Sequence, residues 1–178
     1  FTSTLTGGTD CPAKSGSPKG TIDGISTDTG VAFGWAADPD TLNSSIDVHF
    51  YVDGPAGSGV WAGAVTSNVL RTDVNSFLSD TYCTTVTGNH GFNFTIPDAS
   101  PTDSTKTFKD GEEHTLYAHG IDKVGGQANA LLNPTTGVRF TLGETSVNDS
   151  VTVVKTSIEV APTDTNTQIG IDGGTYIS

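Results

Sequence analysis

Three oxygen-bearing side chains lie within one short run, Asp38-Pro-Asp40-Thr-Leu-Asn43. Calcium binds several oxygen ligands at close range, and Asp and Asn side chains in loops commonly supply them. The same residue types also favour ordinary turns, so the run is compatible with a loop that holds no ion. We expect either a structural Ca²⁺ site, with Asp38, Asp40 and Asn43 as its ligands, or a plain turn.

The chain contains none of the short motifs that mark common catalytic centres. It has no Gly-x-Ser-x-Gly elbow, no His-Glu-x-x-His pair, no Walker loop and no dinucleotide fingerprint. His114 and His119 fall on opposite sides of one predicted strand, which does not favour a shared metal site. We therefore predict a protein that is not an enzyme and has no catalytic residues. A polysaccharide-active hydrolase fragment is the alternative.

The charge of the chain limits its partners. Its 178 residues include 8 Lys and Arg against 20 Asp and Glu, which gives a net charge of −12. Nucleic acid is excluded as a partner because phosphate binding needs a cationic surface. An acidic chain also disfavours anionic membrane surfaces, and we expect no membrane insertion. A neutral ligand or a cation fits this charge, although acidity can also serve only the solubility of a secreted protein.

Short stretches of alternating apolar and polar residues predict an all-β fold. In the stretch 45–53, one face would carry Ile46, Val48, Phe50 and Val52. Further strands of this kind are expected at about 20–26, 30–37, 60–67, 91–96, 114–121 and 136–142. Short strands separated by turns are typical of an antiparallel β-sandwich.

The apolar faces of two other stretches complete the expected core. In the stretch 30–37, Val31, Phe33 and Trp35 share one face, which we assign to the interior; Phe92 follows the same rule. The core would thus close around Val48, Phe50, Phe33 and Phe92. Near 68–78, a different spacing predicts a short helix or a few turns over one end of the sandwich, with apolar residues Leu70, Val74, Phe77 and Leu78.

Composition divides the chain into three parts. Residues 1–19 are expected to form an N-terminal arm or linker, 20–142 the β domain, and 143–178 an extension with extra strands or a link to another module. Cys11 and Cys83 predict one disulfide, with two free thiols as the alternative. A disulfide implies an oxidising compartment, so we expect a secreted or cell-surface protein.

Within residues 20–142, several short motifs follow one another in a recognisable order. They are Gly34-Trp-Ala-Ala-Asp-Pro-Asp40, Val48-His-Phe-Tyr-Val-Asp-Gly54, Arg71-Thr-Asp-Val74, Gly91-Phe-Asn-Phe-Thr-Ile-Pro97 and His114-Thr-Leu-Tyr-Ala-His-Gly-Ile-Asp122. This order resembles Ig-like β-sandwich modules of secreted bacterial proteins. Such modules often accompany glycan-active enzymes or belong to large surface proteins. The resemblance implies an Ig-like sandwich within a larger multidomain protein.

The resemblance and the charge together favour a non-catalytic carbohydrate-binding module with a polysaccharide or glycan as its partner. Sugar binding needs exposed aromatic faces for the C–H side of a pyranose and polar groups for its hydroxyls. The candidate residues that meet this need are Trp61, Tyr51, Tyr82, His90, Asn89 and Arg71. Arg71 and Asp73 also suit hydrogen bonds that tie a crossing segment to the sandwich. The alternative function is a structural spacer, adhesin or fibre module.

Overall fold

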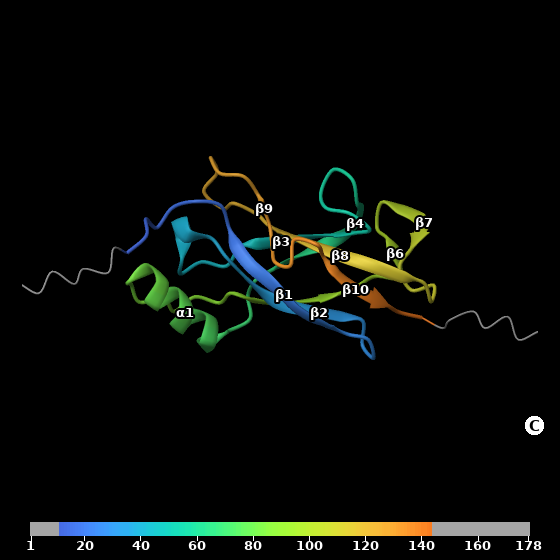
Figure 1. The fold of residues 1–178 in the computed structure, drawn as a ribbon, viewed down its shortest axis with the longest axis horizontal. Helices are drawn as coiled ribbons and strands as arrows, with labels where there is room; N and C mark the ends of the chain where they lie inside the picture. The colour runs from blue at the N-terminus through green and yellow to red at the C-terminus, as the bar shows by residue number, and fades with distance from the viewer. Residues whose placement is uncertain (1–10, 144–178) are drawn as a thin grey trace, which may run out of the picture. The chain divides into compact units, whose positions relative to one another are not determined.

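The seven predicted stretches all form strands of antiparallel sheets. The structure is a computed structural model, and it describes residues 11–143 (Figure 1). The predicted strands are β1 (Lys19–Ser26), β2 (Val31–Ala37), β3 (Asp47–Val52), β4 (Val60–Thr66), β5 (Gly91–Thr95), β8 (Glu113–Gly120) and β10 (Val138–Thr141). The strands expected in the extension after residue 143 lie outside the described residues.

Three further short strands and two helical segments fill the connections. The strands are β6 (Ala99–Ser100), β7 (Asp103–Thr107) and β9 (Ala130–Leu131), and the helical segments are η1 (Pro39–Thr41) and α1 (Thr72–Tyr82). Every residue of β7 is exposed, so this strand has no apolar face by which alternation could reveal it. No helix within residues 11–143 is long and apolar enough to cross a membrane.

The strands pair into two main sheets with one shared core. One sheet has the order β1-β2-β5, and the other has the order β10-β8-β3-β4, with β9 beside β8. Buried side chains from both sheets belong to the same cluster. At its centre, the ring of Phe50 stacks on Phe94 at 4.0 Å between centroids and meets the edge of Phe92 at 5.4 Å. The predicted inward face of β3 is therefore confirmed.

Strand β2 faces the opposite way from the prediction. Its small residues Ala32 and Ala36 are buried, whereas Phe33 is 41% exposed and Trp35 is only partly buried. One reason lies at Gly34, where an added Cβ would clash with the Thr21 carbonyl oxygen of β1 and would meet the Phe92 ring at 2.7 Å. Because the rings of Phe92 in the neighbouring strand β5 and of Phe50 in the other sheet already fill the core, only small side chains fit beneath β2. The prediction that the core closes around Phe33 is wrong.

Helix α1 is present, but it begins later than the predicted range 68–78 and ends at Tyr82. Its buried side is Val74, Leu78 and Tyr82, which pack in a second apolar cluster. Leu70 and Phe77, two of the apolar residues whose spacing predicts the helix, are 58% and 55% exposed. The helix lies at one end of the sheets, away from the hairpin of β6 and β7 (Figure 1).

The predicted disulfide is confirmed: Cys11 is bonded to Cys83, 72 residues further along the chain. Cys83 caps the C-terminus of α1 in a left-handed conformation with a φ of 48°. The bond therefore holds the chain before β1 against the end of α1. A disulfide suits an oxidising compartment.

His114 joins two turns at the end of the sheets. Its Nδ1 lies 2.8 Å from Asp53 Oδ2, and its Nε2 lies 3.2 Å from Asp110 Oδ1. Burial of the ring disfavours the charged imidazolium. The hydrogen bonds to the two carboxylates, together with their charge, outweigh that cost and raise the pKa of His114 above its ordinary value.

The raised pKa of His114 predicts a pH-dependent contribution to stability. Protonation is favoured more in the folded chain than in the unfolded chain, so the contribution is complete below a pH of about 6.5 and is lost as pH rises through the folded pKa. Urea unfolding of wild type and His114→Gln at a series of pH values checks this. The wild type should lose more stability than the variant as the pH rises. Parallel curves for the two proteins would contradict the assignment.

Candidate functional site

Two of the side chains predicted to bind sugar are buried. Tyr82 is 2% exposed as the last residue of the inner stripe of α1, and His90 is 0% exposed immediately before β5. Burial also lowers the pKa of His90, which keeps its ring neutral. Because neither ring has a free face for a pyranose, their assignment to a sugar-binding surface is corrected. Asn89, by contrast, is exposed.

Tyr51 and Trp61 lie together on the outer face of the larger sheet. Tyr51 pairs with Trp61 across β3 and β4, and their ring centroids are 5.3 Å apart. His49 contacts Trp61 edge-on at 5.1 Å, and His119 contacts Tyr51 edge-on at 5.7 Å. The Ala56 amide donates a hydrogen bond to His119 Nε2. The rings of this cluster are thus packed mainly against one another.

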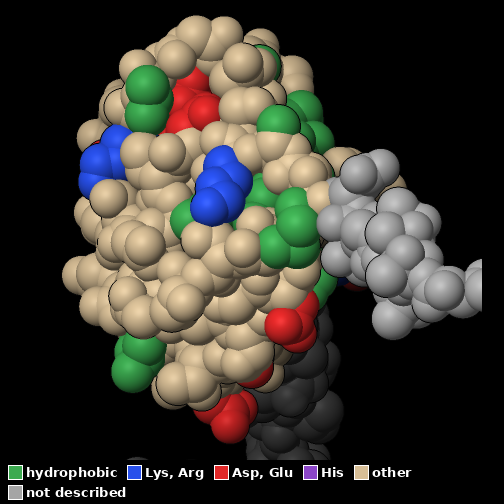
Figure 2. Space-filling model, turned by 90° about the vertical axis from the view of Figure 1, so that its left-hand side faces the viewer, with side chains coloured by type: hydrophobic (Ala, Val, Ile, Leu, Met, Phe, Trp, Pro, Cys, Tyr) green, Lys and Arg blue, Asp and Glu red, His purple; other side chains and the backbone are tan. Residues whose placement is uncertain are grey.

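A different surface is formed where α1 meets the outer face of β2. Trp35 and Phe77 approach edge-on at 5.9 Å between ring centroids. Together with Arg71, Asp73 and Val74 they line a hollow of about 280 Å³. Figure 2 views the molecule from the side of α1, and it shows hydrophobic side chains distributed among polar ones, with a few basic and acidic side chains between them. Of the residues predicted to bind sugar, Arg71 belongs to this hollow.

Arg71 is held in place by two carboxylates. Its Nε and Nη2 donate to Asp73 at 2.9 and 2.7 Å, and its Nη1 donates to Asp23 of β1 at 2.8 Å. The hydrogen bond from Arg71 lowers the pKa of Asp73 to about 2, and the same bonds raise the pKa of the guanidinium. The expected tie between this segment and the sheet is confirmed, and Arg71 and Asp73 stay charged at neutral pH.

A second hollow lies on the other side of the same two rings, because Trp35 pairs with Thr21 of β1, between Asp23, which bonds to Arg71, and Lys19, which lines this hollow. It also measures about 280 Å³, and its lining consists of Pro18, Lys19, Gly20, Trp35, Phe77, Leu131 and Asn133. Asn133 is exposed, and within residues 11–143 its side-chain amide makes no hydrogen bond. Trp35 and Phe77 therefore stand between two hollows, each with its own polar groups.

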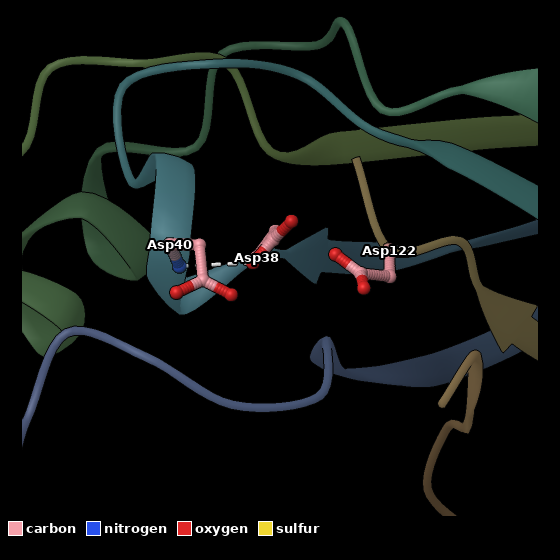
Figure 3. Close-up of side chains that lie close together, drawn as sticks. All are labelled: Asp38, Asp40 and Asp122. Atoms are coloured by element: carbon pink, nitrogen blue, oxygen red, sulfur yellow. Dashed lines mark hydrogen bonds between the residues drawn. The ribbon is translucent and has the colours of Figure 1, made fainter. Parts of the chain in front are cut away.

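The acidic loop singled out in the sequence does contribute to a cluster of carboxylates. Asp38, Asp40 and Asp122 each offer an oxygen within 4.8 Å of the others, from η1 and from the segment after β8 (Figure 3). Asn43 is engaged elsewhere, because its Oδ1 accepts a hydrogen bond from the Thr87 amide at 2.8 Å. The third carboxylate is thus supplied by Asp122, far away in the sequence.

Backbone amides hold two of these carboxylates in place. Asp38 is fully buried and accepts from the amides of Asp40 and Lys123 at 2.9 and 3.0 Å. Asp122 accepts from the Gln127 amide at 2.8 Å, which is the main reason that its pKa is lowered. None of the salt bridges within residues 11–143 involves the three carboxylates. The cluster has the oxygen donors that could hold a metal ion.

Comparison of the chain with known protein families, curated proteins and solved structures found no match. Of the residues predicted to bind sugar, Arg71 lies in the hollow at α1, and Tyr51 and Trp61 lie in the outer cluster of the larger sheet. Phe77 was missed because its spacing also fits the buried side of a helix, and Trp35 was missed because its strand was assigned the opposite orientation.

Proposed function

We propose that the protein is a non-catalytic carbohydrate-binding module and that its sugar-binding surface is the aromatic strip of Phe33, Trp35 and Phe77. The observation that carries this proposal is the outward orientation of β2, which places Phe33 and Trp35 on the solvent side, with Trp35 against Phe77. Successive residues on one face of a strand are about 7 Å apart. The three rings therefore offer a row of apolar surface suited to the C–H faces of sugar rings.

Polar groups beside the strip support the proposal. A guanidinium has five N–H donors, and only three of those on Arg71 are engaged by Asp23 and Asp73. The remaining donors and the exposed oxygens of Asp73 can bond to sugar hydroxyls. Salt bridges fix these groups in advance, which reduces the entropy that is lost when a ligand binds.

The charge around the strip favours neutral sugars. Arg71 is matched by two carboxylates, and the whole chain carries a charge of −12. An anionic glycan would meet net repulsion here, whereas a neutral glycan would not. The pKa of Asp73, about 2, also makes this carboxylate a poor general acid for glycoside hydrolysis. A binding role therefore fits this surface better than a hydrolase role.

The fold that we propose for this module is an Ig-like β-sandwich. Its strands divide between the sheets as β1, β2 and β5 against β10, β8, β3 and β4. This division matches the A, B, E and G, F, C, C′ strands of Ig-like domains, with α1 between C′ and E. We also propose that the module is secreted or displayed on a cell surface as part of a larger protein. The Cys11–Cys83 disulfide supports an oxidising compartment outside the cytosol.

Affinity electrophoresis of the full chain through gels with neutral or acidic polysaccharides tests the function. We expect retardation by at least one neutral polysaccharide and none by acidic polysaccharides such as polygalacturonate. The two tryptophans of the chain, Trp35 and Trp61, then locate the site. Titration with the retained polysaccharide should change the emission of Trp61→Phe, in which only Trp35 reports, and leave that of Trp35→Phe unchanged.

The opposite pattern, with the response confined to Trp35→Phe, would assign binding to the cluster of Tyr51 and Trp61 instead. If no polysaccharide slows the migration of the protein, the proposed carbohydrate-binding function is wrong. Both variants keep an aromatic ring at the substituted position, so a change in core packing does not confuse the result.

We also propose that the carboxylates of Asp38, Asp40 and Asp122 hold a structural Ca²⁺. Three carboxylates that converge with no salt bridge to a basic side chain among residues 11–143 repel one another, and a hard divalent cation would remove that repulsion. The ion would tie η1 to the segment after β8. An ion that binds only the folded chain stabilises the fold. This stabilisation grows with the ratio of the free ion concentration to the dissociation constant.

Differential scanning calorimetry after treatment with a chelator checks the calcium proposal. Excess Ca²⁺ should raise the melting temperature of the wild type and of Asp28→Asn, a control at an exposed turn outside the cluster. Asp122→Asn should not respond, and without Ca²⁺ it should be at least as stable as the wild type because one repelling charge is removed. Equal Ca²⁺ responses in all three proteins would refute the site.

A further inference from the structure

The two hollows at α1 share their central wall. Both are lined by Trp35 and Phe77, so this pair of rings is a ridge with a depression on each side. Each depression measures about 280 Å³, which lies just below the range of about 300–1,000 Å³ typical of small-molecule sites. One depression alone is small for a ligand of several rings, and the two together offer room for a longer one.

The polar groups lie at the two ends of this double hollow. Arg71 and Asp73 lie in one depression, and Lys19 and Asn133 lie in the other. The Nζ of Lys19 lies 5.7 Å from the centre of the Tyr82 ring, and the Asn133 amide makes no hydrogen bond within the described part of the chain. A ligand that bonds to both polar ends must extend across the ridge.

From this arrangement we infer that the groove binds an internal stretch of a neutral glycan chain, with sugar units on both sides of the Trp35–Phe77 ridge, rather than a single sugar or a chain end. The inference rests on the proposed function and specifies its ligand. Hydroxyls of the unit on one side would bond to Arg71 and Asp73. Hydroxyls on the other side would bond to Asn133.

Charge distinguishes a glycan from other occupants of the same groove. The groove holds fixed charges of both signs and several unused hydrogen-bonding groups, which suit a ligand rich in hydroxyls. A second copy of this strongly acidic chain would bring like charge toward Asp23 and Asp73. An uncharged glycan is not repelled by these two carboxylates. The C–H faces of its sugar rings fit the apolar Trp35–Phe77 ridge.

Isothermal titration calorimetry with the full chain tests the inference, with gluco-, manno- and xylo-oligosaccharides from the monosaccharide to the hexasaccharide as probes. For the series that binds, affinity should rise at least tenfold between the monosaccharide and the tetrasaccharide. Conversion of the reducing end of the longer oligosaccharides to an alditol should leave affinity unchanged. A monosaccharide that binds as tightly as the hexasaccharide, or a requirement for one free chain end, would overturn the inference.

Asn133→Ala provides a second readout. It should reduce the affinity for the hexasaccharide severalfold toward that of the short oligosaccharides and leave the affinity for the monosaccharide unchanged. The matched control is Asn68→Ala, an exposed asparagine outside both hollows, which should bind every length like the wild type. If Asn133→Ala also matches the wild type at every length, the second hollow takes no part and the inference is wrong.

Failure of the underlying function has a separate signature. If no oligosaccharide binds and the neutral polysaccharides also fail to retard the wild type, the proposed function itself fails. If no sugar binds and light scattering shows a dimer of the wild type that Phe77→Ala disrupts, the occupant of the groove is a second copy of the chain. Either result rejects the glycan inference, and the two are distinguished by the mass in solution.

Discussion

Phe50→Ala is expected to lower the free energy of unfolding by about 3–5 kcal/mol, the largest effect on stability that we predict for a single residue. Phe50 is fully buried, stacks on Phe94 at 4.0 Å and meets the edge of Phe92. Truncation removes the apolar ring from the point where β3 packs against β5, and it leaves a cavity that close-packed neighbours cannot fill. Denaturant unfolding followed by circular dichroism measures the loss.

Phe33→Ala is the matched control, because the sequence places both phenylalanines on the core side of their strands. In the structure Phe33 is 41% exposed on the outer face of β2. Its truncation should therefore lower the free energy of unfolding by no more than about 1 kcal/mol. A loss of stability as large as that of Phe50→Ala would mean that Phe33 points into the core. That result would contradict both the described orientation of β2 and the aromatic strip.

The number and the boundaries of the main strands could be predicted because alternation depends only on neighbours in the chain. Their inward faces could be predicted where one side was clearly more apolar, as in β3 with Val48 and Phe50. In β2 that rule fails. The Thr21 backbone and the Phe92 ring leave room only for Gly34 and small neighbours inside, and Phe92 belongs to a strand almost sixty residues away.

The same limit applies to the candidate sites. The acidic loop expected from the sequence supplies Asp38 and Asp40 to the carboxylate cluster, but the third carboxylate, Asp122, is brought in by the path of the chain after β8. Likewise, the helix near 68–78 could be predicted from apolar spacing. Its packing against Ala37, Leu42 and Val86 decides that Tyr82 is buried and Phe77 exposed, and these partners lie outside the helix, where local spacing gives no information.

Phe77→Ala should have the largest effect on binding. The ring is 55% exposed and lines both hollows, so its removal should weaken binding of the retained neutral polysaccharide at least tenfold, or about 1.4 kcal/mol. Its contact with Trp35 is one edge-on approach at the surface. The cost in unfolding free energy should therefore stay below about 1 kcal/mol, which separates a binding role from a structural role.

Calorimetric titration of Phe77→Ala beside Val124→Ala tests the central claim most directly, because Val124 is also an exposed apolar residue, 64% exposed, but lies outside both hollows. The account predicts at least a tenfold loss of affinity for Phe77→Ala, unchanged affinity for Val124→Ala, and a folded protein in both cases. Wild-type affinity in a folded Phe77→Ala protein would show that sugars do not bind at the aromatic strip.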